Sequence, residues 1–229
     1  TLSNIEKVVG SNWDDKFITS GIVSNYVDGN EGITGRLEVN GDTVDYSGKN
    51  TGITLDLSVT DTNSSNLTYQ YSTVIVSGSS NDYVKNIENI SGSTTKDIIT
   101  GDDSANTLLG NAGNDTLAGG NGADYIDGGA DNDLINGGLG ADILFGGSGN
   151  DTFIGTTFTG DVINGDSGTT NDGLSDSVDY SLLTGSYGVN VTLNGSTVAN
   201  VAINGSVDHT IVNIENVYGS SYADSIVGD

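Results

Sequence analysis

Large apolar residues recur at every ninth position through the middle of the chain. The series consists of Ile99, Leu108, Leu117, Ile126, Ile135, Leu144 and Phe153. Each of these residues lies at the centre of a short segment between glycine-rich stretches. Glycine permits sharp turns, and a short extended segment turns its central side chain to one face. The pattern therefore predicts an all-β fold, in which stacked strands build an inner ladder of Ile, Leu and Phe.

The repeat divides this region into seven nine-residue units, each with a leading glycine. They are Gly92–Thr100, Gly101–Leu109, Gly110–Ala118, Gly119–Asp127, Gly128–Asn136, Gly137–Phe145 and Gly146–Ile154. Two consecutive units are expected to make one full coil of a parallel solenoid, with one strand and one turn on each side. The first two units keep only their leading glycine, and Asn111 and Asp131 replace turn glycines in later units.

The sixth position of the unit is acidic in six of seven cases: Asp97, Asn106, Asp115, Asp124, Asp133, Asp142 and Asp151. Turn geometry alone accepts Asn or Ser equally well, so the preference for Asp needs another cause. Every second unit lies on the same side of a coil, which stacks these carboxylates in two columns. Hard divalent cations take six or more oxygen ligands, and a glycine-rich turn offers backbone carbonyls beside the carboxylate. The spacing therefore predicts cation sites between successive turns.

Residues 92–154 resemble the RTX (repeat-in-toxin) nonapeptide, G-G-x-G-x-D-x-U-x, where U is a large apolar residue. The resemblance implies a parallel β-roll or β-helix with calcium bound between stacked turns, and about five ions in this block. The Asp115–Asp133, Asp124–Asp142 and Asp133–Asp151 pairs match the motif best, and a site with Asn106 should be weaker. The carbonyl ligands that the resemblance implies are those of Gly110, Ala112, Asn114, Gly119, Asn121, Ala123, Gly128, Ala130, Asn132, Gly137, Leu139 and Ala141.

A second family of repeats flanks the nonapeptide block. Residues 5–11, 87–93 and 214–220 are copies of one motif, and each is followed by Asp and an apolar strand; residues 44–47 and 178–181 form a further pair. We predict three segments: a β-rich flank (1–91), the nonapeptide block (92–155) and a related flank (156–229), with strands near 52–57 and 188–193. The flanks should form longer coils of one solenoid, and the last copy breaks off as in a segment of a longer array. Whether Asp15, Asp42, Asp176 and Asp224 bind further calcium or only make turns is open.

The charge of the chain limits the classes of partner that it can bind. There are 31 acidic and 6 basic residues, for a net charge of −25, and no Lys or Arg follows Lys96. Such a chain repels itself unless cations bind, and it offers no basic patch for nucleic acid or anionic lipid. A single His and no Cys argue against zinc and copper sites, and no apolar run is long enough for membrane insertion. Calcium is thus the expected partner.

The functional expectations follow from this chemistry. We find no motif of a hydrolase, metalloprotease or kinase, and we expect His209 to be an ordinary surface residue, so no catalytic residue is predicted. A regular outward row of Asn114, Asn132 and Asn150 has no matching Thr array, which argues against ice binding.

The RTX resemblance implies type I secretion to the bacterial exterior and folding only with calcium. The first hypothesis is a structural or adhesive segment of a large surface protein (an adhesin or surface-layer component) that contacts neighbouring copies, cell-surface or matrix components. The alternative is an accessory calcium module of a secreted protease, lipase or polysaccharide-modifying enzyme.

Overall fold

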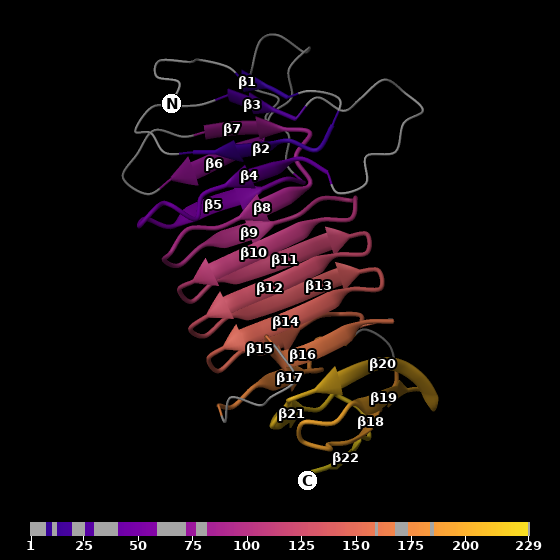
Figure 1. Ribbon diagram of the computed structural model, residues 1–229. Coiled ribbons are helices and arrows are strands. Elements are labelled where there is room, and N and C mark those ends of the chain that lie inside the picture. The colour runs from indigo at the N-terminus through magenta and orange to yellow at the C-terminus, as the bar shows by residue number, and fades with distance from the viewer. Residues whose placement is uncertain are drawn as a thin grey trace.

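In the part of the chain that the structure describes, two facing sheets of 11 strands each run along the protein (Figure 1). The computed structural model describes residues 8–10, 13–19, 26–29, 41–58, 72–76, 82–158, 160–167, 174–183 and 186–228. The first sheet has, in spatial order, β1 (Val8–Val9), β3 (Tyr26–Asp28), β7 (Asp82–Lys85), β6 (Ser72–Val76), β5 (Ile53–Asp56), β9 (Ile98–Thr100), β11 (Thr116–Asn121), β13 (Leu134–Leu139), β15 (Thr152–Ile154), β17 (Ser177–Asp179) and β21 (Asn216–Tyr218). The second has β2 (Lys16–Ile18), β4 (Thr43–Asp45), β8 (Asn89–Ser91), β10 (Thr107–Ala112), β12 (Tyr125–Ala130), β14 (Ile143–Ser148), β16 (Val162–Asp166), β20 (Ser206–Val212), β19 (Ala199–Ile203), β18 (Val189–Thr192) and β22 (Ser225–Val227).

The strand register confirms that two units make one coil. Leu108 of β10 pairs in parallel with Ile126 of β12, and Leu117 of β11 pairs with Ile135 of β13. Alternate units therefore lie in opposite sheets, and the chain crosses between the sheets at every turn. The all-β parallel solenoid expected from the sequence is thus the observed fold.

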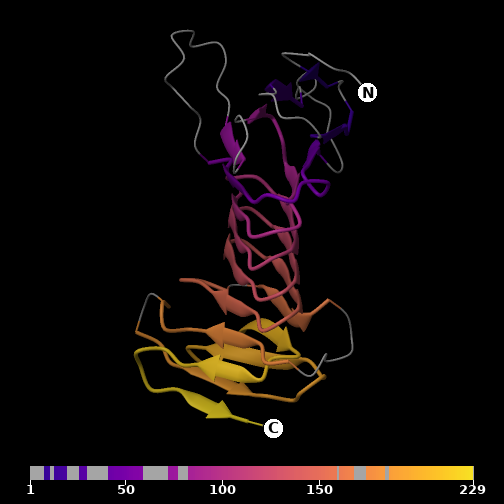
Figure 2. The ribbon, with the colours of Figure 1, turned by 90° about the vertical axis from the view of Figure 1, so that its left-hand side faces the viewer.

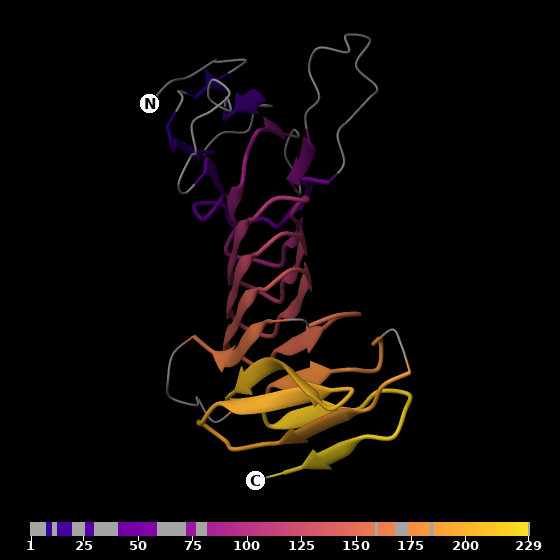
Figure 3. The ribbon, with the colours of Figure 1, turned by 90° about the vertical axis from the view of Figure 1, so that its right-hand side faces the viewer.

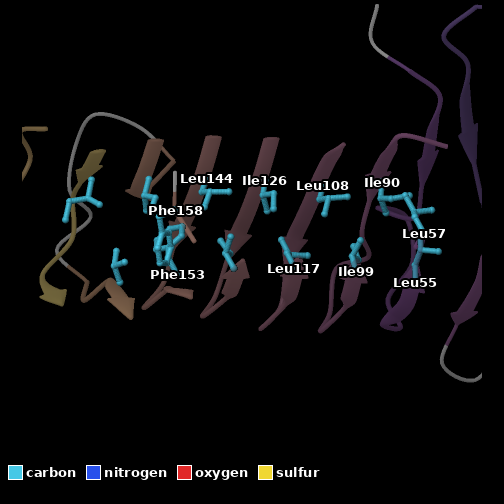
Figure 4. Close-up of a cluster of buried hydrophobic side chains, with 14 of the residues drawn as sticks. Leu55, Leu57, Ile90, Ile99, Leu108, Leu117, Ile126, Leu144, Phe153 and Phe158 are labelled. Carbon is cyan, nitrogen blue, oxygen red and sulfur yellow. The ribbon is translucent and has the colours of Figure 1, made fainter. Parts of the chain in front are cut away.

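One apolar side chain from each nine-residue unit fills the space between the sheets (Figure 4). The seven predicted residues, Ile99, Leu108, Leu117, Ile126, Ile135, Leu144 and Phe153, are all buried. The ladder extends beyond them through Val44, Leu55, Ile90, Ile163 and Val178. Burial of one such side chain contributes about 1.5–3 kcal/mol, so the core of each coil is small.

The turns explain why two non-glycine residues are tolerated in the repeat. Asn111 and Asp131 adopt φ of 77° and 74°, in the left-handed region where the glycines of other units lie. Asn and Asp enter this region at lower cost than other residues with a side chain. The two departures from the nonapeptide pattern therefore keep its backbone path.

The coils lengthen outside the block, as predicted for the flanks. Thr152 of β15 pairs with Ser177 of β17, and Val162 of β16 pairs with Thr210 of β20. Antiparallel excursions widen both ends: β5–β6–β7 in one flank and β18–β19–β20 in the other. Figures 2 and 3 show the narrow central roll and the broader C-terminal part.

Strand pairing is continuous across the predicted boundaries after residues 91 and 155, which stay predictions. In the first flanking copy, residues 5–7 and 11 lie outside the described residues. The part of the chain that is described contains no helix long and apolar enough to span a membrane.

Candidate calcium-binding ladder

The sixth-position side chains form two columns, one at an edge of each sheet. Each residue sits just before a strand, where its own unit turns into the extended segment. All seven, Asp97, Asn106, Asp115, Asp124, Asp133, Asp142 and Asp151, are buried. The structure therefore brings together the side chains that the spacing assigned to the same side of the coil.

Hydrogen bonds tie each column together from coil to coil. In the first column the backbone N–H of Asp97 donates to Asp115 Oδ1 (2.8 Å), and that of Asp115 donates to Asp133 Oδ1 (2.7 Å). The same bond joins Asp133 N–H to Asp151 Oδ1 (2.7 Å). In the second column Asn106 N–H donates to Asp124 Oδ1 (2.8 Å), and Asp124 N–H to Asp142 Oδ1 (2.9 Å). One carboxylate oxygen of each of these aspartates thus accepts a hydrogen bond from the preceding coil.

The second carboxylate oxygen has a different environment. Oδ2 of Asp115, Asp124, Asp133 and Asp142 is buried and has no hydrogen-bond partner. Each lies over the leading glycine of its own unit, in a space that a Cβ atom would fill. A buried charged oxygen without a partner costs more than the 1–3 kcal/mol or so of a neutral group, so it requires a proton or a cation.

Backbone carbonyls border the same space. Above Gly110 lie Asp115 Oδ2 and the carbonyl oxygen of Gly128 in the next coil; above Gly128 lie Asp133 Oδ2 and the Gly146 carbonyl. Gly119, with Asp124 and Gly137, repeats the arrangement in the other column. We call each such space, over a leading glycine, a cradle. A carboxylate and a carbonyl from successive coils are the oxygen ligands that calcium prefers, so these residues fit the ion.

The remaining predicted carbonyl ligands are distributed along the turns. Ala112, Asn121, Ala130 and Leu139 end their strands, and the Ala130 carbonyl accepts a hydrogen bond from Gly113 N–H (3.1 Å). Asn114, Asn132, Ala123 and Ala141 lie on the exposed side of the turn, where Asn114 Oδ1 accepts from Asn132 N–H (3.1 Å). Among the described residues no three His, Asp or Glu side chains converge. Their roles as ligands stay predictions, and backbone oxygens would have to supply most of each shell.

Asn106 differs from the aspartates in its column. Its Oδ1 accepts from Asp102 N–H (2.9 Å), and its Nδ2 donates to the Glu88 carbonyl (3.1 Å). Both ends of the amide are therefore satisfied within the protein. That a site with Asn106 is the weaker one stays a prediction.

Burial raises the pKa of the column carboxylates. The pKa of Asp115 and of Asp124 rises to about 7, and that of Asp133 to about 8. Desolvation is the largest cause in each case, and the negative charges of neighbouring aspartates add to it, with Asp115 and Asp151 acting on Asp133. The metal-free ladder therefore resists ionisation at neutral pH, and a bound cation would favour the ionised form.

The comparison with protein families agrees with this geometry. The model of the RTX calcium-binding nonapeptide repeat (4 copies) matches residues 91–126 and 118–153. Residues 91–153 are RTX calcium-binding repeats. The RTX block thus makes the chain a calcium-binding module of the kind typical of secreted proteins. No curated protein matches the sequence.

The ladder also continues beyond the RTX block, and one of its members, Asp161, was not predicted from the sequence. Asp142 N–H donates to Asp161 Oδ1 (3.0 Å), and Asp151 N–H donates to Asp176 Oδ1 (2.8 Å). Burial raises the pKa of both Asp161 and Asp176 to about 7. The segment Asp161-Val162-Ile163 carries the D-x-U signal, but it lies one residue out of the nine-residue register.

His209 is not the surface residue that the sequence suggested. It is 2% exposed, because the strand alternation of β20 turns it inward at the wide C-terminal coil. Its Nε2 is 2.6 Å from the Tyr180 hydroxyl, and its ring stacks on Phe158. Burial lowers the pKa of His209, and the Asp208 carboxylate, 3.1 Å from Nδ1, opposes that shift. The cluster packs the end of the core.

Proposed function

We propose that the chain is a calcium-dependent structural or adhesive segment of a large secreted bacterial surface protein, such as an adhesin or a surface-layer component. The observation that carries the proposal is the extent of the carboxylate ladder. It runs from Asp97 to Asp176 on one side of the solenoid, beyond the RTX block itself. A solenoid whose central part is built on stacked acidic turns is suited to bear load between its ends.

The residues suggest how the segment folds outside the cell. Without a cation the ionised aspartates of neighbouring coils repel one another, and Oδ2 of Asp115, Asp124, Asp133 and Asp142 has no hydrogen-bond partner. The open, acidic chain suits type I export from a cytosol poor in free calcium. Bound calcium supplies the positive charge that the columns lack, and because no cradle exists in the unfolded chain, its binding free energy adds to the free energy of folding.

The role we propose is structural rather than enzymatic. Tyr180 and His209 are buried and pack against the ring of Phe158, which suits a packing role better than contact with a substrate. The alternative, an accessory module of a secreted RTX protease, lipase or polysaccharide-modifying enzyme, would share the same calcium chemistry. The duplicated flanks favour an array, in which partners would be neighbouring copies or cell-surface and matrix components.

A calcium titration followed by circular dichroism tests the proposal. We expect a cooperative gain of β signal with calcium, reversal by chelator, and little effect of magnesium at equal concentration. Isothermal calorimetry on the same sample would give the number of ions, for which we propose about five in the RTX block. A folded β spectrum in chelator at neutral pH, unchanged by calcium, would contradict calcium-dependent folding.

A further inference from the structure

The motif that flanks the RTX block carries a glutamate that the calcium ladder has not yet accounted for. Residues 86–89 and 213–216 both read Asn-Ile-Glu-Asn; the first copy leads into β8, before the RTX strands, and the second into β21, beyond them (Figure 1). In each copy the glutamate accepts a hydrogen bond from an aspartate of the preceding coil: Asp42 N–H to Glu88 Oε2 (2.7 Å) and Asp176 N–H to Glu215 Oε2 (2.8 Å). In the RTX block the same N–H donates to an aspartate of the next coil. Glutamate thus takes the place of aspartate in both flanks.

The backbone of the two copies agrees as well. Glu88 N–H and Asn89 N–H both donate to the Asp42 carbonyl (3.2 and 2.9 Å). In the second copy the N–H groups of residues 215 and 216 donate to the Asp176 carbonyl (3.1 and 2.9 Å). The first asparagine of each copy adopts a left-handed φ, 52° in the first and 53° in the second. The motif is therefore one structural device that occurs once on each side of the RTX block.

Each copy borders a space with the same oxygens as the cradles of the RTX block. Above Gly165 lie Asp176 Oδ2 and the carbonyl oxygen of Asn213, and above Gly29 lie Asp42 Oδ2 and the carbonyl oxygen of residue 86. In an RTX unit the acidic residue comes five positions after the glycine that supplies the carbonyl. Here it comes two positions after the asparagine. The turn is shorter and the side chain longer, so these spaces lie outside the nonapeptide pattern.

Asn213 brings a further oxygen to the C-terminal space. Its side chain is 0% exposed, and its Nδ2 donates to Oδ1 of Asn164, the neighbour of Gly165 in the chain (2.8 Å). Its own Oδ1 is buried and has no hydrogen-bond partner. A buried amide oxygen without a partner costs about 1–3 kcal/mol, which contact with a cation would offset.

The charges around Asp176 act in the same direction. Asp176 is 2% exposed, and burial raises its pKa to about 7, with the negative charges of Asp151, Asp166 and Glu215 adding to the shift. No Lys or Arg follows Lys96 in the sequence, so this half of the chain supplies no positive side chain of its own. The coil therefore gathers carboxylate, carbonyl and amide oxygens around a buried space.

We propose that each Asn-Ile-Glu-Asn motif closes a calcium site outside the RTX block. The two sites share one arrangement, in which an aspartate, an asparagine and a glutamate surround the space over a glycine: Asp176, Asn213 and Glu215 over Gly165, and Asp42, Asn86 and Glu88 over Gly29. Calcium suits this donor set better than magnesium, because it accepts six to eight oxygens in irregular geometry, whereas magnesium keeps several waters. The inference rests on the proposed calcium-dependent folding and adds one site to each flank.

Glu88→Gln and Glu215→Gln test the two sites separately. Glutamine keeps an oxygen for the aspartate N–H and removes the charge, and both residues lie outside the nonapeptide units, so the RTX sites keep their ligands. We would measure calcium binding to the full chain by equilibrium dialysis over a range of free calcium. We expect one ion to bind at least about 10-fold more weakly in each variant, and two ions in the double variant, because ligand charge sets calcium affinity. Asp179→Asn, which removes the charge of an exposed turn near the C-terminal site, should bind as wild type does.

Gly165→Ala tests the position of the ion. The new Cβ would meet Asp176 Oδ2 and the Asn213 carbonyl, so this variant should lose the same ion as Glu215→Gln, and the two changes together should lose no second ion. Gly48→Ala, where nothing lies within 4 Å, is the control. Circular dichroism at saturating calcium would verify that each variant is folded, and Gly165→Ala replaces Glu215→Gln if that variant unfolds.

The outcomes separate this inference from the proposed function. If the unmodified chain shows no calcium-dependent β signal, the proposed function fails. If the chain folds with calcium but Glu88→Gln, Glu215→Gln and Gly165→Ala bind calcium as their controls do, the glutamates only complete the hydrogen bonds of the columns. The flank sites are then refuted, while the proposed function stands.

Discussion

Replacement of Asp133 by Asn should affect stability in opposite directions with and without calcium. Asp133 lies in the middle of its column: Oδ1 accepts from Asp115 N–H, and its own N–H donates to Asp151 Oδ1. Asparagine keeps the acceptor and the shape of the side chain, and it removes the charge. The Asp133→Asn variant therefore separates the hydrogen-bonding role of the residue from its ionic role.

The pKa of Asp133 gives the size of the metal-free effect. The pKa is about 8 in the folded chain against the ordinary 3.8, so the unfolded state is ionised at pH 7 while the folded state still binds a proton. A shift of one pKa unit corresponds to about 1.36 kcal/mol. Between pH 3.8 and pH 7, the retained proton on Asp133 therefore lowers the free energy of unfolding by about 4 kcal/mol. In chelator Asp133→Asn should raise the free energy of unfolding by up to that amount at pH 7, by about 1.6 kcal/mol at pH 5, and by almost nothing at pH 4.

In calcium the same change should weaken folding, because the ions on either side of residue 133 each lose a carboxylate ligand. We expect a higher calcium midpoint by circular dichroism in the variant and more β signal than wild type in chelator. Asp131→Asn is the matched control, since it removes a charge from an exposed residue in the same turn and should change stability by less than about 0.5 kcal/mol. Equal chelator stability of Asp133→Asn and wild type at pH 7 would refute the reasoning.

Three further predictions follow from the same structure. In chelator, β structure should be present near pH 4–5 and be lost toward pH 8, because the raised carboxylate pKa values mean that the folded state binds more protons than the unfolded state in this range. His209, whose pKa is lowered, opposes the trend below pH 6.5, but it is outnumbered by the aspartates whose pKa is raised. Circular dichroism that is flat with pH would contradict this prediction. Gly128→Ala should raise the calcium midpoint and cost about 1–3 kcal/mol, because the new Cβ meets Asp133 Oδ2 and the Gly146 carbonyl. Gly48→Ala, where nothing lies within 4 Å, should match wild type in the same titration. Tyr180→Phe should cost about 1–3 kcal/mol in urea unfolding at saturating calcium, since it removes the buried hydroxyl that contacts His209 Nε2, whereas exposed Tyr187→Phe should be neutral.

Where the nine-residue repeat is strict, the sequence alone was sufficient to predict the fold and the buried positions. Identical spacing fixes identical geometry, so the inward position of Ile126 and the coil of two units could be read from the nine-residue period. Asp161 was missed because one inserted residue breaks the period while the strand pairing absorbs it. His209 was misjudged because its burial depends on Phe158 and Tyr180, which come from other coils at no fixed spacing. Contacts of this kind arise where coils of different length pack on one another, so no local sequence pattern predicts them.

The two parts of the core explain why the carboxylates matter most in the middle of the chain. Each nine-residue unit of the RTX block buries one large apolar side chain, and this burial offsets only part of the conformational entropy that the unit loses on folding. Strand hydrogen bonds offset part of that cost, but the buried, unpartnered Oδ2 atoms add to it. At the C-terminal end the core widens into Phe158, Tyr180 and His209, with aromatic contacts across coils. In the described residues of the narrow roll the core has no comparable buried aromatic cluster, so we expect its folding to depend on the cation that its columns are proposed to bind.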